Sequence, residues 1–107
     1  MKKPYVYVIV RKDISHEQKV VQASHAALEA GFAFQQPGRT ASIVVLEVPG
    51  RCTLLETAER LERKGIEHIM FYEPDFGMGH SAIATRPVFT SAERKIFHIY
   101  PLLNAGN

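Results

Sequence analysis

Two stretches of the sequence contain the side chains whose types and spacing could support chemistry. In the first, which covers residues 13–32, Gln18, Gln22 and His25 recur at intervals of three and four residues and are followed by Glu29. Residues at this spacing lie on one side of an α-helix, so we expect them to form a polar stripe. Such a stripe beside an apolar face indicates either polar groups satisfied at the edge of a core or a site for a polar ligand.

The second stretch is the loop at residues 73–80, which holds two carboxylates, two glycines and a histidine directly before Ser81. The Asp75 carboxylate could orient or deprotonate a water molecule. Gly77 and Gly79 could let backbone N–H groups approach an anion or a developing oxyanion. The alternatives are that the glycines only supply the backbone angles of a tight turn and that Asp75 bonds its own turn.

Other familiar chemistries lack their sequence signatures. The five histidines are never paired at the spacing of a helical metal site, and Cys52 is the only cysteine, so we expect no metal ion. Ser81 follows one glycine and a histidine, which is not the nucleophile-elbow motif and argues against a triad of Ser81, a histidine and Asp75. No phosphate-binding loop or dinucleotide fingerprint is present, so we expect no cofactor.

The composition bounds the kind of protein. With 107 residues, of which 46% are hydrophobic, the chain is expected to form one domain, residues 1–107, around a single core. The net charge of +2 comes without dense basic runs, so any contact with nucleic acid must be local. A lone cysteine suits a reducing compartment, and the first apolar run is too short for a signal peptide. We therefore expect a cytoplasmic protein with no transmembrane segment.

Four strands are expected to position these residues. They are predicted by runs of apolar and β-branched residues at 5–10, 41–48, 66–72 and 81–85. The first run is almost wholly apolar, which is typical of a central strand covered on both faces. Strands that alternate with helices imply right-handed crossovers and parallel pairing, whereas the last two strands share only a loop and should be antiparallel. The expected fold class is α/β with a mixed four-stranded sheet.

Three helices are expected between and after the strands. Their starts are predicted by three capping boxes, Ser15 with Gln18, Thr53 with Glu56, and Thr90 with Glu93. The first should end near Phe34 and the second at Lys64 and Gly65, while residues 104–107 should form a loose tail. Helical periodicity places the buried face of the first helix at Val20, Val21, Ser24, Ala27, Leu28, Gly31 and Phe32. The buried face of the second is predicted at Leu54, Leu55, Ala58 and Leu61.

These motifs together resemble one known family, the type II peptidyl-tRNA hydrolases. The resemblance rests on Arg11-Lys12-Asp13, on Gln22-Ala23-Ser24-His25-Ala26-Ala27, and on Asp75 with a glycine ahead of a hydroxyl residue on the last strand. It is specific in the helix, where the glutamine, histidine and alanine stand at the family's spacing. The motifs cover about a third of the chain, and the expected order of elements extends the likeness over most of it.

The resemblance implies a function and a fold. Members of that family are cofactor-free esterases that cut the bond between the terminal carboxyl of a peptide and the ribose of transfer RNA. The family's fold is three-layered, α/β/α, with helices on both faces of a mixed four-stranded sheet, and it is commonly a homodimer. By this resemblance, Asp75 would hold the attacking water molecule. Ser81, where the family usually has threonine, would fix or relay a proton. Gln22 would bind the ester carbonyl or the terminal ribose, and His25 would anchor the helix.

Basic residues near strand ends are the expected contacts of the RNA. Arg11, Lys12 and Arg86 would meet phosphates and make affinity depend on salt, although each is otherwise an ordinary solvated charge. The expected substrate-binding set is His25, Arg11, Lys12, Gly77, Gly79 and Arg86.

One departure from the family pattern concerns a cation. The family has a lysine four residues before its glutamine, but Gln18 stands there and Lys19 follows it. A shift of one residue turns a helical side chain by about 100°, so Lys19 replaces the cation only if its stem curls round. Gln18 and Lys19 are therefore both catalytic candidates. The alternative function is a noncatalytic module on the same fold that binds an RNA end, a small acyl compound or a protein.

Overall fold

A four-stranded mixed sheet forms the middle of the computed structural model, which describes residues 2–104. The elements, in chain order, are β1 (Tyr5–Arg11), α1 (His16–Ala33), β2 (Ser42–Val48), α2 (Arg51–Arg63), β3 (His68–Glu73), β4 (Gly79–Thr85) and α3 (Ser91–Lys95). The strand order is β2-β1-β4-β3. β1 pairs with β2 in parallel, whereas β4 is antiparallel to both β1 and β3. The mixed sheet and the antiparallel last pair are thus confirmed.

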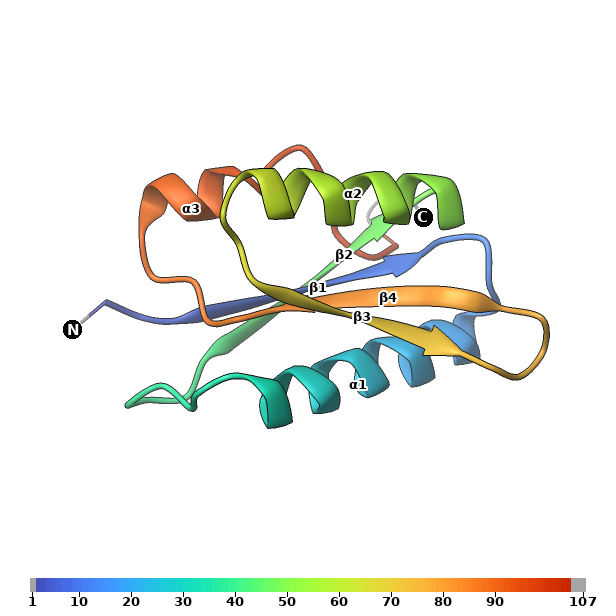
Figure 1. The fold of residues 1–107 in the computed structure, drawn as a ribbon, viewed down its shortest axis with the longest axis horizontal. Coiled ribbons are helices and arrows are strands. Elements are labelled where there is room, and N and C mark those ends of the chain that lie inside the picture. The colour runs from blue at the N-terminus through green and yellow to red at the C-terminus, as the bar shows by residue number, and fades with distance from the viewer. Residues whose placement is uncertain (1, 105–107) are drawn as a thin grey trace.

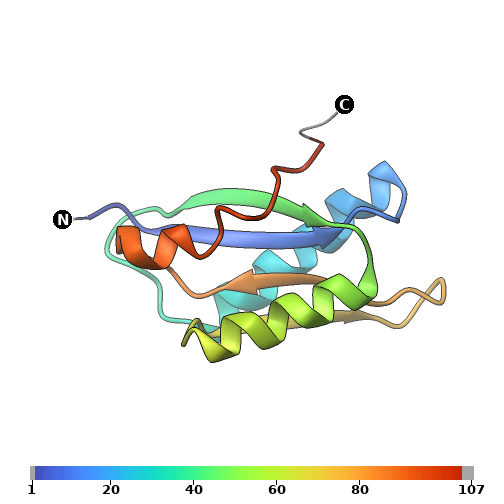
Figure 2. The same ribbon diagram turned by 90° about the horizontal axis from the view of Figure 1, so that it is seen from above.

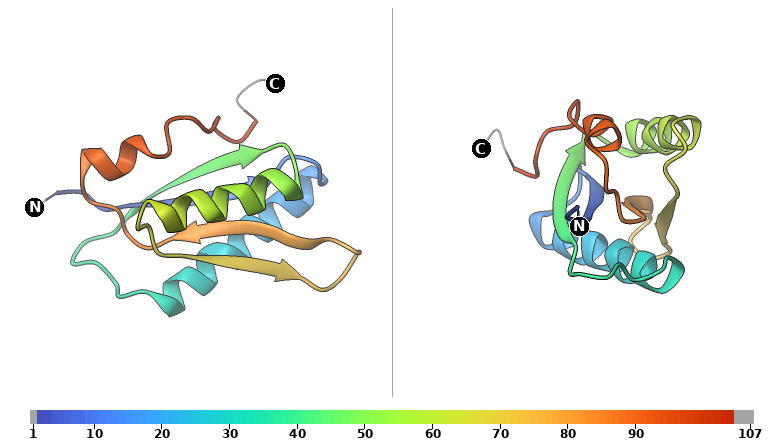
Figure 3. Two further views of the ribbon diagram at one scale, coloured as in Figure 1. Left: turned by 45° about the horizontal axis from the view of Figure 1, so that its top comes forward. Right: turned by 90° about the vertical axis from the view of Figure 1, so that its left-hand side faces the viewer.

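Helices cover both faces of the sheet. α1 lies on one face, and α2 and α3 lie on the other (Figure 1). Seen from above, α2 runs along the sheet over β4 and β3, and α3 lies near the beginning of β1 (Figure 2). The view along the strands in Figure 3 shows the three layers edge-on. The residues predicted as a loose tail lie, except for Asn104, outside the described part of the chain. Among residues 2–104, no helix is both long and apolar enough to cross a membrane.

The central strand β1 separates two apolar cores. Its Val8, Ile9 and Val10 are at most 1% exposed, which confirms a strand covered on both sides. Ile9 belongs to the larger core under α2 and α3, which also contains Leu54. Val8 and Val10 belong to the smaller core under α1. Side chains of one strand alternate between the two faces, so this alternation fixes which residues of the neighbouring strands can meet α1.

The predicted buried face of α1 is wrong except at Ala27, which packs against the core under α1. The residues that α1 buries are Lys19, Gln22, Ala26 and Ala30, whereas Val20, Leu28 and Phe32 are 56%, 53% and 76% exposed. The reason is that α1 packs through alanines against Ala82 and Ala84 of β4. Small side chains on both elements allow a close approach, so the helix turns its alanine stripe and not its largest apolar residues toward the sheet.

Most helix ends lie at the residues predicted from capping and turn signals. The Ser15 and Thr90 hydroxyls accept hydrogen bonds from Gln18 N and Glu93 N, which confirms two starts. Lys64 ends α2, and Gly65 has φ +76°, as predicted.

The predicted start of α2 is wrong by three residues, since the cap is Gly50 and not Thr53. This helix begins at Arg51 after Gly50, because the Gly50 carbonyl already accepts a hydrogen bond from Leu54 N. Thr53 therefore lies inside α2, where its carbonyl accepts a bond from the Thr57 hydroxyl. Leu55, predicted to be buried, is 38% exposed.

Candidate active site

The polar stripe of α1 meets the sheet at the buried amide of Gln22. The Gln22 side chain is 0% exposed. Its Nε2 donates to Gln18 Oε1 at 3.1 Å and to Glu73 Oε1 at 2.8 Å, and its Oε1 accepts from the Ser81 hydroxyl at 2.6 Å. Both N–H donors and the carbonyl oxygen of this amide are therefore engaged. Gln22 connects α1 to β3 and β4 and fixes the position of each of its partners.

A β-bulge brings Ser81 to the α1 face. Ile83 packs in the core under α2, so strict alternation along β4 would turn Ser81 toward α2 as well. The pairing register shifts between Phe71 and Tyr72, since Phe71 lies opposite Ala82 and Tyr72 lies opposite His80. Ser81 is the extra residue of this bulge, and its hydroxyl reaches Gln22. Bulges commonly re-aim a side chain in this way beside functional sites.

Glu73 is the site residue that the sequence analysis missed. It is the last residue of β3, it is 9% exposed, and it accepts the shorter of the two hydrogen bonds that the Gln22 amide donates. That bond from Gln22 is the main cause that lowers the pKa of Glu73, and the Asp75 N–H and the charge of His25 act in the same direction against desolvation. The alternation of side chains along β3 could have revealed it. Glu73 stands two residues after Phe71 and so lies on the same face of the strand, and Phe71 packs on the α1 side of the sheet.

The loop after β3 carries Asp75 to the surface. The Asp75 N–H donates to Glu73 Oε2 at 3.3 Å, while the Asp75 side chain is exposed. Met78 N donates to Asp75 O at 3.2 Å, and Phe76 and Gly77 between them both have φ +62°. Positive φ at both central residues is the arrangement of a type I′ turn. The alternative that the glycines supply the backbone angles of a tight turn therefore accounts for Gly77. It also accounts for Gly79, whose φ is +72°.

Arg11 ties this loop to the end of β1. Its Nη1 donates to Met78 O at 2.6 Å and to His80 O at 3.2 Å. Its Nε and Nη2 donate to the two carboxylate oxygens of Asp13 at 2.8 and 2.9 Å. The hydrogen bond from Arg11 lowers the pKa of Asp13, and the same bond raises the pKa of Arg11. An arginine that is engaged at three nitrogens supports the loop, whereas its neighbour Lys12 is exposed.

The two candidates for the family's cation lie in different surroundings. Gln18 is half-buried and bonded to Gln22, whereas Lys19 is 8% exposed on the stripe that faces the sheet. His25, and not Lys19, is among the groups that lower the pKa of Glu73. The His25 ring stacks on Phe71 with 4.5 Å between centroids and 2° between planes, so it rests against β3 beside the site.

Most of the predicted site residues thus gather at one end of the sheet, but Arg86 does not. Gln18, Gln22, His25, Asp75 and Ser81 surround Glu73, as the contacts above show. Arg86 follows the other end of β4, about 17 Å from Ser81 along the strand. There it donates to Glu93 at 2.8 Å and to the carbonyl of Gly65 at 3.3 Å. Its surroundings are those of a structural ion pair.

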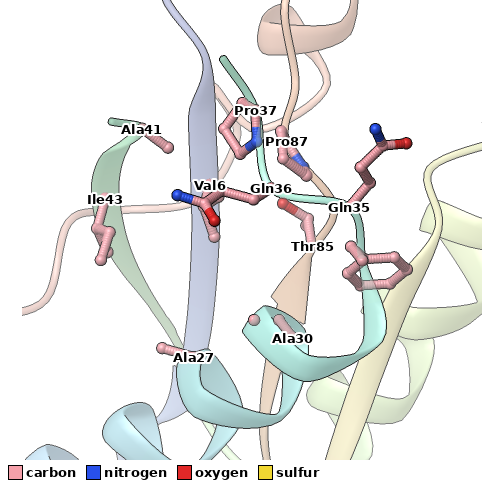
Figure 4. A pocket seen from close by; sticks show the side chains of 12 residues that line it. Val6, Ala27, Ala30, Gln35, Gln36, Pro37, Ala41, Ile43, Thr85 and Pro87 are labelled. Carbon is pink, nitrogen blue, oxygen red and sulfur yellow. The ribbon is translucent and has the colours of Figure 1, made fainter. Parts of the chain in front are cut away.

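A pocket of about 310 Å³ opens at that other end, away from Gln22. It lies between the C-terminal turn of α1 and the strands β1, β2 and β4 (Figure 4). Its lining is mainly apolar, with Val6, Ala27, Phe34 and Ile43 among the walls, and no lining residue is ionisable. Within residues 2–104, no group of three or more histidine, cysteine, aspartate or glutamate side chains could hold a metal ion.

The chemistry that the Gln22 end can support is hydrolysis at a carbonyl. Asp75 offers a solvent-accessible carboxylate on a backbone held by Glu73, and Gln18 offers an amide one helical turn from Gln22. A general base and a hydrogen-bond donor on a rigid support are the elements that ester cleavage requires.

Comparison with known proteins gives two curated relatives and a solved structure. The chain is 34% identical over 97 residues to a human protein named "Putative peptidyl-tRNA hydrolase PTRHD1", and the match covers 76% of this chain and 69% of the relative. The mouse protein of the same name is 33% identical with the same coverage. A protein of unknown function from Agrobacterium tumefaciens, Atu0240, is similar in structure with a TM-score of 0.63 over 96% of this chain and 99% of its own. At 17% identity, that likeness shows the fold alone. No family model matches the chain.

Proposed function

Since the chain belongs to the PTRHD1 family, we propose that it is an esterase that hydrolyses the bond between a peptide and the terminal ribose of transfer RNA. The observation that carries this proposal is the hydrogen-bonded cluster of Gln22, Glu73 and Ser81 beneath the loop that presents Asp75. Residues from α1, β3 and β4 hold one another there, so the exposed carboxylate rests on a rigid base.

In the proposed reaction, the Asp75 carboxylate accepts a proton from a water molecule whose oxygen attacks the ester carbonyl carbon. Negative charge then develops on the carbonyl oxygen, and Gln18 stabilises it. The bond from Gln22 to the Gln18 oxygen holds the Gln18 amide in place and leaves its Nε2 donors for this role. The ester C–O bond breaks, and the ribose oxygen leaves with the proton that Asp75 had accepted. The products are a free peptide carboxyl and a free ribose hydroxyl.

The structure suggests different roles for Gln22 and Ser81 from those that the family resemblance implied. Both N–H groups of Gln22 are bonded to Gln18 and Glu73, so in this proposal Gln22 positions its neighbours and does not bind the ester. The Ser81 hydroxyl holds the Gln22 oxygen from β4 and keeps the amide in that orientation.

The finer parts of the proposal are a type II peptidyl-tRNA hydrolase fold, a transfer RNA partner, a homodimer and a cytoplasmic location. Lys12, exposed beside Arg11, is the residue that contacts phosphate. Val20 and Leu28, more than half exposed on α1, offer an apolar surface for a second copy. Sedimentation equilibrium tests this last part, since a chain that stays monomeric contradicts the homodimer.

The experiment that tests the proposed function is peptide release from purified peptidyl-tRNA. The wild-type chain should yield free peptide and intact transfer RNA. Gln18→Ala should lower kcat by about 10- to 1000-fold, because an oxyanion donor is lost. Gln36→Ala, which removes an exposed amide at the pocket end, is the matched control and should change kcat less than twofold. A wild-type chain that releases no peptide contradicts the proposal.

A second candidate function is a noncatalytic module that binds an RNA end, a small acyl compound or a protein. One observation favours it. The Gln22 amide is wholly buried and fully bonded, which suits a structural role as well as a catalytic one. This candidate requires saturable binding of such a ligand without turnover, so peptide release by the wild-type chain contradicts it.

A further inference from the structure

The tip of the β3–β4 hairpin exposes an aromatic ring next to Asp75. Phe76 is 78% exposed, the largest exposed fraction among the large hydrophobic side chains of residues 2–104. It precedes Gly77 at the centre of the turn that the Met78 N to Asp75 O hydrogen bond closes. A phenylalanine side chain at this position therefore buries little of its apolar surface.

The backbone at Phe76 is also unfavourable for its side chain. Its φ of +62° lies in the left-handed region, which glycine, asparagine and aspartate adopt readily and a bulky residue does not. The first central position of a type I′ turn favours those same small residues. A strained, exposed aromatic ring satisfies neither packing nor backbone preference, and such outliers cluster at sites that contact ligands.

The chemistry of the proposed substrate offers a partner for this ring. The ester lies on the ribose of the last nucleotide, so the unpaired base of that nucleotide is one sugar away from the reacting carbon. Phe76 directly follows Asp75, and adjacent Cα atoms are about 3.8 Å apart, so the two side chains leave the backbone at a separation smaller than one nucleoside. Unpaired bases at RNA ends stack on aromatic side chains, and this stacking holds the end in place.

We propose that Phe76 stacks on the 3′-terminal base of transfer RNA and so places the ribose ester beside Asp75. This inference rests on the proposed function, because it takes the ester to be bound at Asp75. It assigns to Phe76 a role in substrate binding that is separate from the proton transfer of Asp75 and from the hydrogen-bonded support under it.

The test uses two short RNA strands that end in CCA and differ only at the last nucleotide, which is intact in one and abasic in the other. Binding is measured by fluorescence anisotropy, with no ester present. The wild-type chain should bind the intact strand about tenfold more tightly than the abasic strand. Phe76→Asn should bind both strands equally, at the affinity of the wild-type chain for the abasic strand.

Two further measurements separate stacking from a structural role. Asparagine tolerates positive φ, so Phe76→Asn should melt no lower than the wild-type chain, and any loss of binding is then not a loss of folding. Phe32→Ala is the matched control. Phe32 is 76% exposed, almost as much as Phe76, but it lies ten residues after Gln22 on α1, about 15 Å further along the helix. This variant should keep the tenfold preference for the intact strand.

Each outcome is decisive for the inference. A wild-type chain that binds the two strands equally, or that binds neither, overturns it, and so does a Phe76→Asn variant that keeps the preference. Peptide release is assayed separately. A chain that prefers the intact strand through Phe76 but releases no peptide supports the stacking and contradicts the esterase, so the two failures are distinguishable.

Discussion

The two ends of α1 meet the sheet in opposite ways. At its N-terminal end, Gln22 is buried against Glu73 and Ser81 with every polar atom of its amide bonded. At its C-terminal end, Ala27 and Phe34 line a pocket of about 310 Å³ with no ionisable group in its walls. This apolar pocket would direct attention to the C-terminal end. The carboxylates of the candidate site, Glu73 and Asp75, lie at the other end of α1, where hydrogen bonds hold them outside this pocket.

The largest combined loss of stability and activity should come from breaking the polar end at its centre. Gln22→Leu keeps the volume of the side chain but leaves the Ser81 hydroxyl and the Glu73 carboxylate without their buried partner. An unsatisfied buried polar group costs about 1–3 kcal/mol, so the free energy of unfolding should fall by about 2 kcal/mol. Hydrolysis should fall about 100-fold, because the Asp75 loop loses its support. Urea unfolding and initial rates measure the two effects. Unchanged stability together with unchanged rate would show that this cluster does not support the site.

A smaller effect is expected where the loop is fastened to β1. Arg11→Lys keeps the charge but loses the fork that binds Asp13 and the carbonyls of Met78 and His80 together. We expect kcat to fall about tenfold and hydrogen exchange at residues 75–78 to become faster. Lys12→Met is the contrast, since loss of a phosphate contact should raise KM and weaken its salt dependence with kcat unchanged. Arg11→Lys with an unchanged kcat and unchanged exchange would remove Arg11 from the positioning role.

The pH dependence of stability should also differ between variants at the two ends of α1. The pKa of Glu73 in the folded chain is lowered from its ordinary value near 4.5, chiefly by the bond from Gln22. The ionised form therefore stabilises the fold above pH 4.5, and this contribution is lost as the pH falls through the lowered pKa. Glu73→Gln still accepts the Gln22 bond but cannot titrate, so its melting temperature should fall less between pH 6 and about pH 3. Glu67, exposed at the other end of the sheet, is the control, and Glu67→Gln should follow the wild-type curve. A Glu73→Gln curve that coincides with the wild-type curve would contradict the role of Glu73.

The smallest effect is predicted at the pocket end. A Cβ added at Gly31 would meet no atom within 4 Å, so Gly31→Ala fits without strain. Alanine in a helix is favoured over glycine by about 0.5–1 kcal/mol, and the melting temperature should rise accordingly. Hydrolysis should stay within twofold of the wild-type rate. A large loss of activity would mean that the pocket takes part in the reaction after all.

The sequence predicted the elements of this fold better than the way they face each other. Apolar β-branched runs identify strands, and Ser15 and Thr90 mark helix starts, because both signals act over a few residues. The buried side of α1 depends instead on Ala82 and Ala84 of β4, more than fifty residues away. Periodicity in α1 alone could not show that an alanine stripe would face the sheet while Phe32 faced outward.

The candidate site shows the same limit. Helical spacing was enough to group Gln18, Gln22 and His25, and their place at the site follows from the local sequence. The position of Ser81 depends on a bulge, which is a property of the register between β3 and β4 and has no signal within β4 alone. Glu73 was passed over because it stands next to a loop rich in polar residues, where its burial under α1 is not visible.

The measurement that tests the central claim most directly is the single-turnover rate of peptide release, with enzyme in excess over peptidyl-tRNA. Asp75→Asn preserves the size of the side chain and removes its basicity, so the rate constant should fall at least about 100-fold. Glu67→Gln, which neutralises an exposed carboxylate remote from the site, should release peptide at the wild-type rate. If Asp75→Asn releases peptide as fast as the wild-type chain, the N-terminal end of α1 is not where the ester is cut.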